Sequence, residues 1–252
     1  MEKERYARNE SNIQRLLKQG RGQAIGYRFT PCLFIRHVPN RGRSHTVFGR
    51  ASCRVRTLPS DIEYAHFLIF DRDESVIDNR DQFYLNRNDN TRIADACGFR
   101  HPKDPASDTL AVVTTDLVVT DCNKQVPINK AFAGKPFSEL HKPHIGEKLT
   151  SHEFYLIDKN VSFDILMERD VPLDLKRYLH WLREYRDVTD FEELRLEYFT
   201  SLTKNLLIRM SDYCTHRLSL SEMCARLHDT FACVAGAHIM TTRHMLSIGI
   251  FH

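Results

Sequence analysis

Residues 110–119 read LAVVTTDLVV, a run of apolar, mostly β-branched residues that contains one carboxylate, Asp116. Branched residues favour β-strands, and a run as apolar as this one predicts a strand inside a sheet. A buried aspartate is costly unless a partner or a metal ion satisfies it. Asp116 is therefore a candidate site residue; the alternative is an aspartate on an edge strand that faces water.

A second strand is predicted just before this run, over residues 75–85, where apolar and polar residues alternate. With a period of two, Asp78, Arg80 and Gln82 share one face of this strand. That face either supports a site or is an ordinary polar surface. Residues 86–108 are polar and rich in turn-forming residues, which predicts a loop.

Two further strands are predicted after the run, over residues 131–135 (AFAGK) and 161–167. Residues 137–159 between them read mostly as helix, which Pro143 is expected to interrupt. Lys135 closes the first of these strands. These predicted strands, with a helix between the last two, together predict a mixed α/β core.

A helix is predicted to begin after Ser60, with Glu63 in its first turn. Ser60 and Glu63 have the spacing of a capping box, in which the glutamate bonds back to the start of the helix. A carboxylate at this position can also face a metal ion. Both interpretations place Glu63 at the start of the helix.

The composition is that of a globular protein of 252 residues with one large domain or two ordinary ones. No apolar run approaches the length of a membrane span, and the N-terminus lacks a signal-peptide pattern, so we expect a cytoplasmic protein without a membrane partner. The seven cysteines form no Cys-x-x-Cys pair, which indicates reduced thiols. No pair of histidines has the context of a zinc site.

The net charge of +3 is unevenly distributed. Residues 1–56 contain 13 lysines and arginines against 3 acidic residues, and the remainder contains 23 against 30. A basic leading segment favours contact with nucleic-acid phosphates, and an acidic remainder favours a protein partner; the alternative is a solvated charged surface. The arginines predicted to contact DNA are Arg21, Arg41, Arg43, Arg54 and Arg56.

The composition changes after residue 170, which predicts a catalytic domain over residues 1–170 and a second domain over 171–252. Residues 173–185 and 191–210 read as helices, Ser219 begins a capping box for another, and a further short helix follows. Residues 245–251 have strand character. Helices that close on a strand suggest a winged-helix-like module, and because the chain ends inside this strand we expect it to be truncated.

Several short motifs, taken together, resemble the TnsA endonuclease subunits of heteromeric bacterial transposases. They fall in the family's order across about residues 10–185. They are Lys18-Gln19-Gly20-Arg21-Gly22-Gln23, Val38-Pro39 with Gly42-Arg43-Ser44-His45, Leu58-x-Ser60-Asp61-x-Glu63, Asp78-x-Arg80-x-Gln82-Phe83-x-Leu85, His101-Pro102, Thr115-Asp116-Leu117-Val118, Lys135-Pro136 and Glu147-Lys148-Leu149.

The resemblance implies a restriction-endonuclease-like catalytic domain followed by a smaller winged-helix-like domain. It also implies a Mg²⁺-dependent enzyme, with Mn²⁺ as a substitute, that cuts the 5′ ends of a transposon. Its partners would be transposon-end DNA, a TnsB-type transposase that processes the 3′ ends, and a TnsC-type ATPase regulator. The family's catalytic residues fall on Glu63, Asp116 and Lys135.

One position departs from the family pattern. Members usually carry glutamine two residues before the catalytic lysine, and here that position is Ala133. Metal ligands would then be Glu63, Asp116 and the carbonyl of Gly134. A different strand register, which would involve Gln125, Asn129 or Lys130, is the alternative; the ungapped match from Ala131 favours Lys135.

The expected reaction is hydrolysis of a DNA phosphodiester by a metal-activated water. Lys135 would position that water and offset charge in the transition state. Because Ala133 removes one polar group, a catalytically weak assembly subunit that bridges transposase, ATPase and DNA is the second hypothesis. A stand-alone nuclease of the same fold is the third.

Overall fold

The structure is a computed structural model that divides the chain into two compact units, residues 1–172 and 173–252. This division lies close to the predicted boundary at residue 170. The described residues are 9–32, 43–104, 107–122, 126–186, 196–214, 218–231, 233–234 and 236–249.

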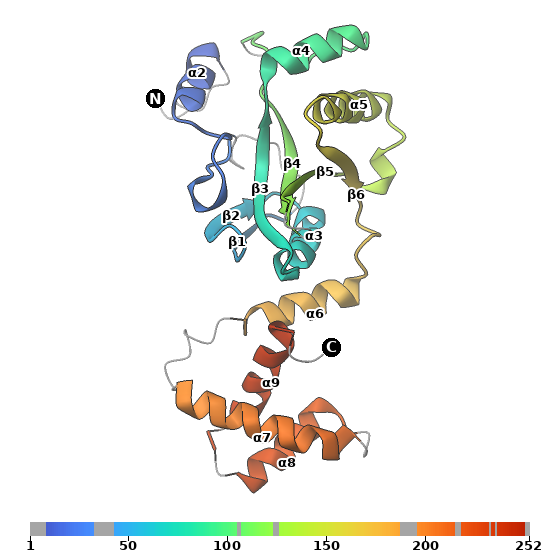
Figure 1. Ribbon diagram of the computed structural model, residues 1–252. Helices are drawn as coiled ribbons and strands as arrows, with labels where there is room; N and C mark the ends of the chain where they lie inside the picture. The colour runs from blue at the N-terminus through green and yellow to red at the C-terminus, as the bar shows by residue number, and fades with distance from the viewer. Residues whose placement is uncertain are drawn as a thin grey trace. The chain divides into compact units, whose positions relative to one another are not determined.

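The first unit is a mixed α/β domain (Figure 1). Its elements are, in chain order, α2 (Glu10–Lys18), η1 (Gly26–Arg28), β1 (His45–Gly49), β2 (Arg54–Leu58), α3 (Asp61–Arg72), β3 (Val76–Leu85), α4 (Arg87–Ala96), β4 (Val113–Asp121), β5 (Ile128–Gly134), η3 (Phe137–Glu139), α5 (Pro143–Ile157) and β6 (Ser162–Leu166). Strands β3, β4, β5 and β6 form one sheet in that order, and β1 pairs with β2 in a separate hairpin. The sheet is mixed, because β3–β4–β5 are antiparallel and β5–β6 are parallel. The predicted mixed α/β core is confirmed.

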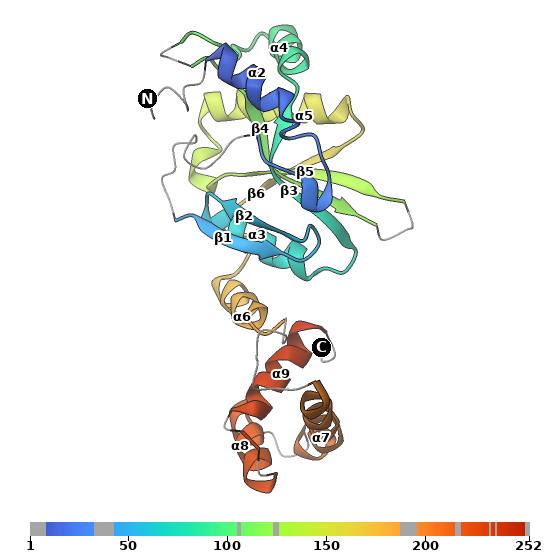
Figure 2. The ribbon, with the colours of Figure 1, turned by 90° about the vertical axis from the view of Figure 1, so that its left-hand side faces the viewer.

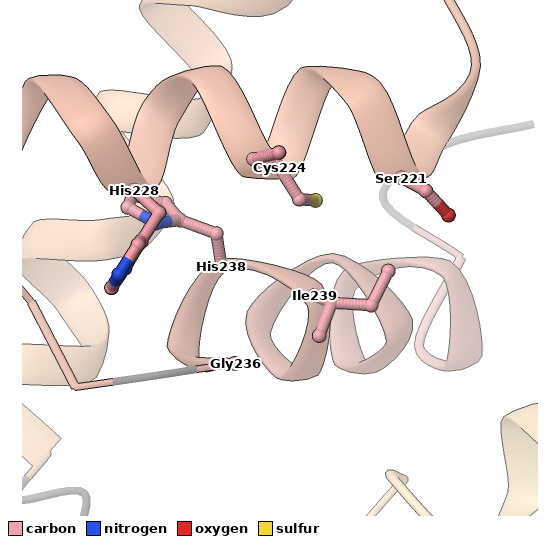
Figure 3. A pocket seen from close by; sticks show the side chains of 7 residues that line it. Ser221, Cys224, His228, Gly236, His238 and Ile239 are labelled. Atoms are coloured by element: carbon pink, nitrogen blue, oxygen red, sulfur yellow. The ribbon is translucent and has the colours of Figure 1, made fainter.

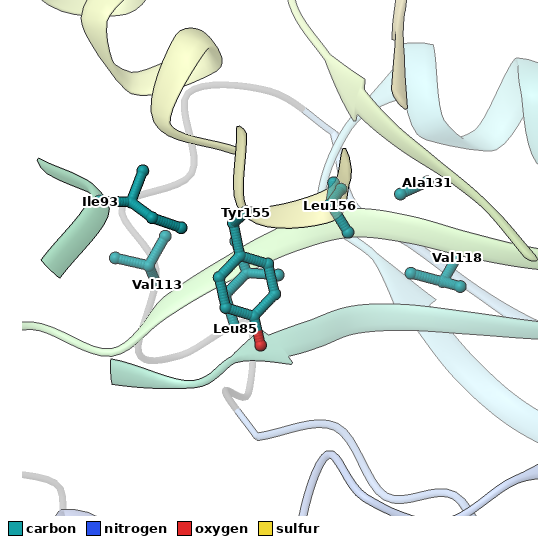
Figure 4. Packing of buried hydrophobic residues seen from close by; sticks show 7 residues of the cluster. All are labelled: Leu85, Ile93, Val113, Val118, Ala131, Tyr155 and Leu156. Carbon is teal, nitrogen blue, oxygen red and sulfur yellow. The ribbon is translucent and has the colours of Figure 1, made fainter. Parts of the chain in front are cut away.

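Helices cover both faces of this sheet. Figure 2 shows α4 and α5 on one side of the strands, with α3 and the β1–β2 hairpin on the other. On the α5 side, apolar residues of the helices and strands form a buried cluster (Figure 4). Its members are Leu85, Ile93, Val113, Val118, Ala131, Tyr155 and Leu156. On the α3 side, the rings of Phe70 and Phe132 lie 5.0 Å apart.

Most elements begin and end where their local chemistry predicts. The side chain of Ser60 caps α3 by accepting a hydrogen bond from the amide of Glu63. Pro143 opens α5, where its missing amide costs nothing, so the predicted interruption before this helix is confirmed.

The predicted loop over residues 86–108 is wrong in its first half. Helix α4 occupies Arg87–Ala96, and the side chain of Asn86 caps it by accepting from the amides of Asn88 and Asp89. The helix is polar because few of its residues are buried, so its apolar signal is weak. The capping asparagine was the feature that could have predicted it.

The second unit contains the helices α6 (Leu173–Arg183), α7 (Leu196–Cys214), α8 (Leu220–Thr230) and α9 (Ala237–Ser247). The predicted capping box at the start of α8 is confirmed, with Ser219 and Glu222 bonded reciprocally. The predicted strand over 245–251 is wrong at Met245–Ser247, which form the last turn of α9. Its apolar residues are buried against other helices rather than in a sheet, and the winged-helix form stays a prediction.

No helix within the described residues combines the length and the apolar character needed to cross a membrane. The six cysteines whose side chains the structure describes are free thiols: Cys32, Cys53, Cys97, Cys122, Cys224 and Cys233.

Candidate active site

Asp116 lies on β4 at the point where its pairing with β5 ends. The last paired residues are Leu117 and Phe132, so Asp116 and Ala133 would come next in the register. Instead of continuing the ladder, the carboxylate of Asp116 accepts a 2.8 Å hydrogen bond from the amide of Gly134 through Oδ2. This bond fixes the carboxylate at the edge of the sheet where β4 and β5 separate.

Glu63 approaches the same place from the first turn of α3. A Cβ built on Gly134 would lie 3.4 Å from Cγ of Glu63 and 3.8 Å from Oδ2 of Asp116, so both carboxylate side chains pass beside this glycine. The Oε1 atom of Glu63 accepts a 2.8 Å hydrogen bond from the Ser60 hydroxyl. Its Oε2 atom is buried and has no hydrogen-bond partner among the described residues.

Lys135 completes the group. Its Nζ lies 3.4 Å from Oδ2 of Asp116 and donates a 2.6 Å hydrogen bond to the carbonyl of Gly134. The three residues predicted to be catalytic are therefore brought together. The Gly134 carbonyl is a predicted metal ligand, and in this structure it accepts the hydrogen bond from the Lys135 ammonium group.

The two carboxylates differ in their electrostatic surroundings. Burial, together with the charge of Asp116, raises the pKa of Glu63 well above its usual 4.5. Burial would raise the pKa of Asp116 as well, but Lys135, Lys148 and the Gly134 amide outweigh it and lower that pKa below 3.8. Asp116 is therefore the firmly ionised member of the pair.

Gln82 joins the site from the neighbouring strand β3. Its Nε2 lies 3.4 Å from Oδ1 of Asp116, and its Oε1 accepts a 2.8 Å hydrogen bond from the Thr114 hydroxyl. Gln82 has a φ of +47°, in the left-handed region, so the backbone of β3 is distorted beside the site.

The other two residues of that predicted polar face serve elsewhere. Asp78 accepts from the amide of Gly26, and Arg80 donates to Thr120 and to Asn129. Asn129, one of the alternatives for a shifted register, is thus occupied by Arg80.

The second alternative for that register, Lys130, pairs with Asp121 at 3.2 Å. Gln125 lies outside the described residues. The observed placement of Lys135 matches the ungapped register.

Sequence reasoning missed Lys148 and His152, which lie one turn apart on α5. Both interact electrostatically with Asp116. Lys148 keeps much of its surface exposed, but desolvation of its charged end lowers its pKa, while Asp116 opposes that shift. The spacing of four residues from Lys148 to His152 was the available signal, because it puts both side chains on one face of a helix.

Arg54 and Arg56 do not fit the prediction that they contact DNA. Their side chains are 8% and 0% exposed, and both point at the carboxylate of Asp81, with which Arg54 forms an ion pair. The guanidinium groups also stack on Phe29 and Phe67. These contacts hold both guanidinium groups inside the domain, away from the surface that a phosphate could approach.

The remaining arginines of that prediction are placed differently. Arg43 is exposed. Arg21 is half-buried and donates to the side chain of Gln19 and the carbonyl of Pro31. Arg41 lies outside the described residues.

The residues present fit a divalent cation. Two carboxylates meet in a buried setting, and one oxygen of Glu63 has no hydrogen-bond partner in the described chain. A bound cation would reduce the repulsion between the two carboxylates and would give the unpartnered oxygen of Glu63 a ligand bond. Oxygen atoms are the ligands that Mg²⁺ prefers. Within the described residues no group of three His, Cys, Asp or Glu side chains could hold a metal ion. Among these residue types, the described chain therefore offers only Glu63 and Asp116 as ligands at this site.

The second unit has a hollow of its own, a cavity of about 340 Å³ (Figure 3). Residues of α8 and of the start of α9 line it, including Cys224, His228 and His238. Near it, the thiol of Cys233 lies 3.5 Å from Nδ1 of His228 and 3.2 Å from Nδ1 of His238. None of these side chains belongs to the carboxylate site of the first unit.

The first unit is thus an α/β domain whose mixed sheet carries an acidic pair and a lysine at one edge, an arrangement consistent with a restriction-endonuclease-like fold. No protein-family model matches the chain. The chain is similar to the transposon Tn7 transposition protein TnsA of Escherichia coli, with 35% identity over 175 residues. It is a TnsA-like protein. The match covers 69% of this chain and 63% of that relative, so the chain spans a little less than two thirds of the relative's length.

Proposed function

We propose that this chain is the endonuclease subunit of a heteromeric transposase, which cuts the 5′ ends of a transposon during DNA transposition. The observation that carries the proposal is the buried carboxylate of Glu63, with one oxygen unpartnered in the described chain, beside the ionised Asp116. Similarity to a transposition protein supports the biological setting. Metal dependence, the strand that is cut and the partners are parts of the proposal.

Glu63 and Asp116 would hold Mg²⁺, and the bound ion would polarise the scissile phosphate and lower the pKa of a water molecule. The protein's own groups prepare the site for this. The Gly134 amide holds Asp116 in place, and Ser60 orients Glu63. Lys135 lies close enough to Asp116 to offset negative charge that develops on the phosphate.

The similarity to a transposition protein also supports a proposal about partners. We propose that a TnsB-type transposase processes the 3′ ends and selects the transposon-end DNA, and that a TnsC-type ATPase regulates the assembly. A chain that tracks phosphates without reading base sequence would depend on such partners for its choice of site.

A catalytically weak assembly subunit is the second candidate function. Ala133 favours it, because this residue, next in register to Asp116, offers no polar atom to a metal ion or a water. In that case the fold would serve mainly to connect the transposase, the ATPase and DNA.

Cleavage of a supercoiled plasmid that carries both transposon ends separates these candidates. The wild-type chain and the Asp116→Asn variant would each be combined with the cognate transposase and Mg²⁺, and the two strands mapped separately. We expect Asp116→Asn to abolish 5′-end cleavage while 3′-end cleavage and complex assembly persist. The variant Glu147→Gln, at an exposed position of α5, is the matched control.

If Asp116→Asn leaves excision of both strands unchanged, the nuclease proposal is wrong and the assembly role stands. If the chain alone cuts a defined sequence, it is a stand-alone nuclease.

A further inference from the structure

His152 on α5 is a buried histidine without a protein partner in the described chain. It is 2% exposed, and neither Nδ1 nor Nε2 has a hydrogen-bond partner. Its ring lies 6.1 Å from that of Phe163, in an edge-on arrangement. Buried polar atoms are nearly always hydrogen-bonded, so an imidazole with two unused nitrogens calls for a ligand or a water molecule.

The packing of α5 on β5 indicates what lies beneath this ring. Leu156 of α5 packs in the same cluster as Ala131 of β5 (Figure 4). Because β5 and β6 are parallel and α5 connects them, the helix runs back along β5 in the opposite direction. Four residues of helix cover about 6 Å, and two residues of strand cover roughly 6.6 Å. By this spacing, one step from Leu156 and Ala131 leads to His152 and Ala133, so we expect the imidazole to lie near Ala133.

The next step would bring Lys148 near Lys135, and the two residues do interact electrostatically. Ala133 is 2% exposed and would stand opposite Asp116 if the β4–β5 ladder continued. The electrostatic influence of both Lys148 and His152 on Asp116 agrees with this placement. A side chain as small as the methyl group of Ala133 would leave room there for an imidazole.

The protonation state of the ring suits it to bind water. Burial, and then the neighbouring Lys148, lower the pKa of His152 to about 3. The ring is therefore neutral near pH 7, with one nitrogen that donates and one that accepts. A neutral ring adds no positive charge beside Lys135 and Lys148, so it does not oppose a cation at Asp116.

We propose that His152 is a positioning residue that orients water in the hydration shell of a metal ion at Asp116, the part that a polar side chain at position 133 would otherwise take. This inference rests on the proposed metal-dependent function. In this proposal α5 supplies the polar side chain that β5, with alanine at position 133, does not supply.

Binding of Mn²⁺ to the full-length chain, measured by electron paramagnetic resonance without DNA, tests the proposal. His152→Leu keeps the volume of the side chain and removes its polar atoms. We expect it to weaken Mn²⁺ binding about 10- to 100-fold, the usual effect of removing an outer-shell partner. Thermal unfolding of the metal-free variant should not be impaired, because an unsatisfied polar ring is replaced by an apolar one. His144→Ala, at an exposed position of the same helix, is the control.

A double variant distinguishes this role from simple packing. Ala133→Gln together with His152→Ala moves the polar group from α5 to β5, and we expect it to bind Mn²⁺ more tightly than His152→Ala alone. A purely structural role for His152 predicts no such recovery.

Asp116→Ala separates failure of this inference from failure of the proposed function. If Asp116→Ala abolishes Mn²⁺ binding but His152→Leu binds as wild type does, the inference is overturned and the metal site remains. If the wild type binds no Mn²⁺, or Asp116→Ala binds it equally well, both are overturned.

Discussion

Glu63 combines two interactions that the sequence presented as alternatives. One oxygen accepts a hydrogen bond from the Ser60 hydroxyl at the start of α3. The other is buried beside Gly134 and has no hydrogen-bond partner in the described chain. Capping fixes the direction of the side chain, so the unpartnered oxygen needs no reorganisation to meet a cation. The cost of that arrangement is a carboxyl group whose ionised form is disfavoured when no metal is bound.

The pH dependence of stability should reveal this cost. Burial and Asp116 raise the pKa of Glu63 above 4.5, so the folded chain holds this proton more tightly than the unfolded chain. The resulting stabilisation is complete below pH 4.5 and is lost as pH rises through the raised pKa. We expect Glu63→Gln to remove this loss, so that in EDTA the variant unfolds at a higher temperature than wild type near pH 8.

Differential scanning fluorimetry between about pH 5 and 8 checks the expectation. Mg²⁺ should stabilise the wild type and not Glu63→Gln. Equal pH profiles for the two proteins would mean that Glu63 is ionised and satisfied without metal.

At the scale of elements, the β1–β2 hairpin is held to the sheet by charge as well as by apolar packing. Arg54 and Arg56 of β2 reach the carboxylate of Asp81 on β3, which is almost completely buried. Removing one partner of such a buried ion pair destabilises the folded protein, because the other charge stays buried and unpaired.

Asp81→Asn should therefore destabilise the chain by about 3–5 kcal/mol, measured by urea denaturation. Asp121→Asn, which removes a more exposed partner of Lys130, should cost less than about 1 kcal/mol. An unaffected Asp81→Asn variant would mean that the two arginines do not depend on this carboxylate, and would restore them as candidates for phosphate contact.

Gly134 offers a second test at this scale, because it separates the two carboxylates. A methyl group there would lie 3.4 Å from Cγ of Glu63 and 3.8 Å from Oδ2 of Asp116. These are ordinary contact distances, so we expect Gly134→Ala to fold normally. The methyl group would, however, take up space beside both carboxylates, and we expect Mn²⁺ to bind roughly 10-fold more weakly. Gly146→Ala on α5, where a methyl group meets open space, is the control; equal Mn²⁺ affinity in both variants would contradict a metal between the carboxylates.

The elements that sequence predicted best are those whose pattern reflects their own burial. The β-branched run of β4 and the cap of α3 predicted both structure and the position of Asp116 and Glu63. Helix α4 was missed because it buries few residues, so its apolar pattern is weak. The C-terminal turn of α9 was missed because its apolar residues pack in a helical core rather than in a sheet, which tertiary structure decides. The burial of Arg54 depends on Asp81, 27 residues away, which no local pattern reveals.

At the scale of the whole molecule, the basic leading segment has less surface charge available to DNA than its composition suggests. Two of its arginines are buried against Asp81, and Arg50 donates to the carbonyls of Asp71, in the last turn of α3, and of Asp73, just after it. Arg43 remains exposed. DNA contact by this segment would then depend on a few surface arginines rather than on the whole cluster.

The salt dependence of DNA binding measures how many such contacts form. We expect the isolated chain to bind transposon-end and scrambled duplexes with similar affinity, because phosphate contacts carry no sequence information. Arg43→Ala should weaken binding to both and reduce the slope of log K against log salt concentration by about 1, as expected for the loss of one phosphate contact. Arg92→Ala, exposed on α4, is the control and should leave the slope unchanged. Fluorescence anisotropy over a range of salt concentrations gives these slopes. A strong preference for the transposon-end duplex would contradict the expectation, because it would show that the chain itself reads bases.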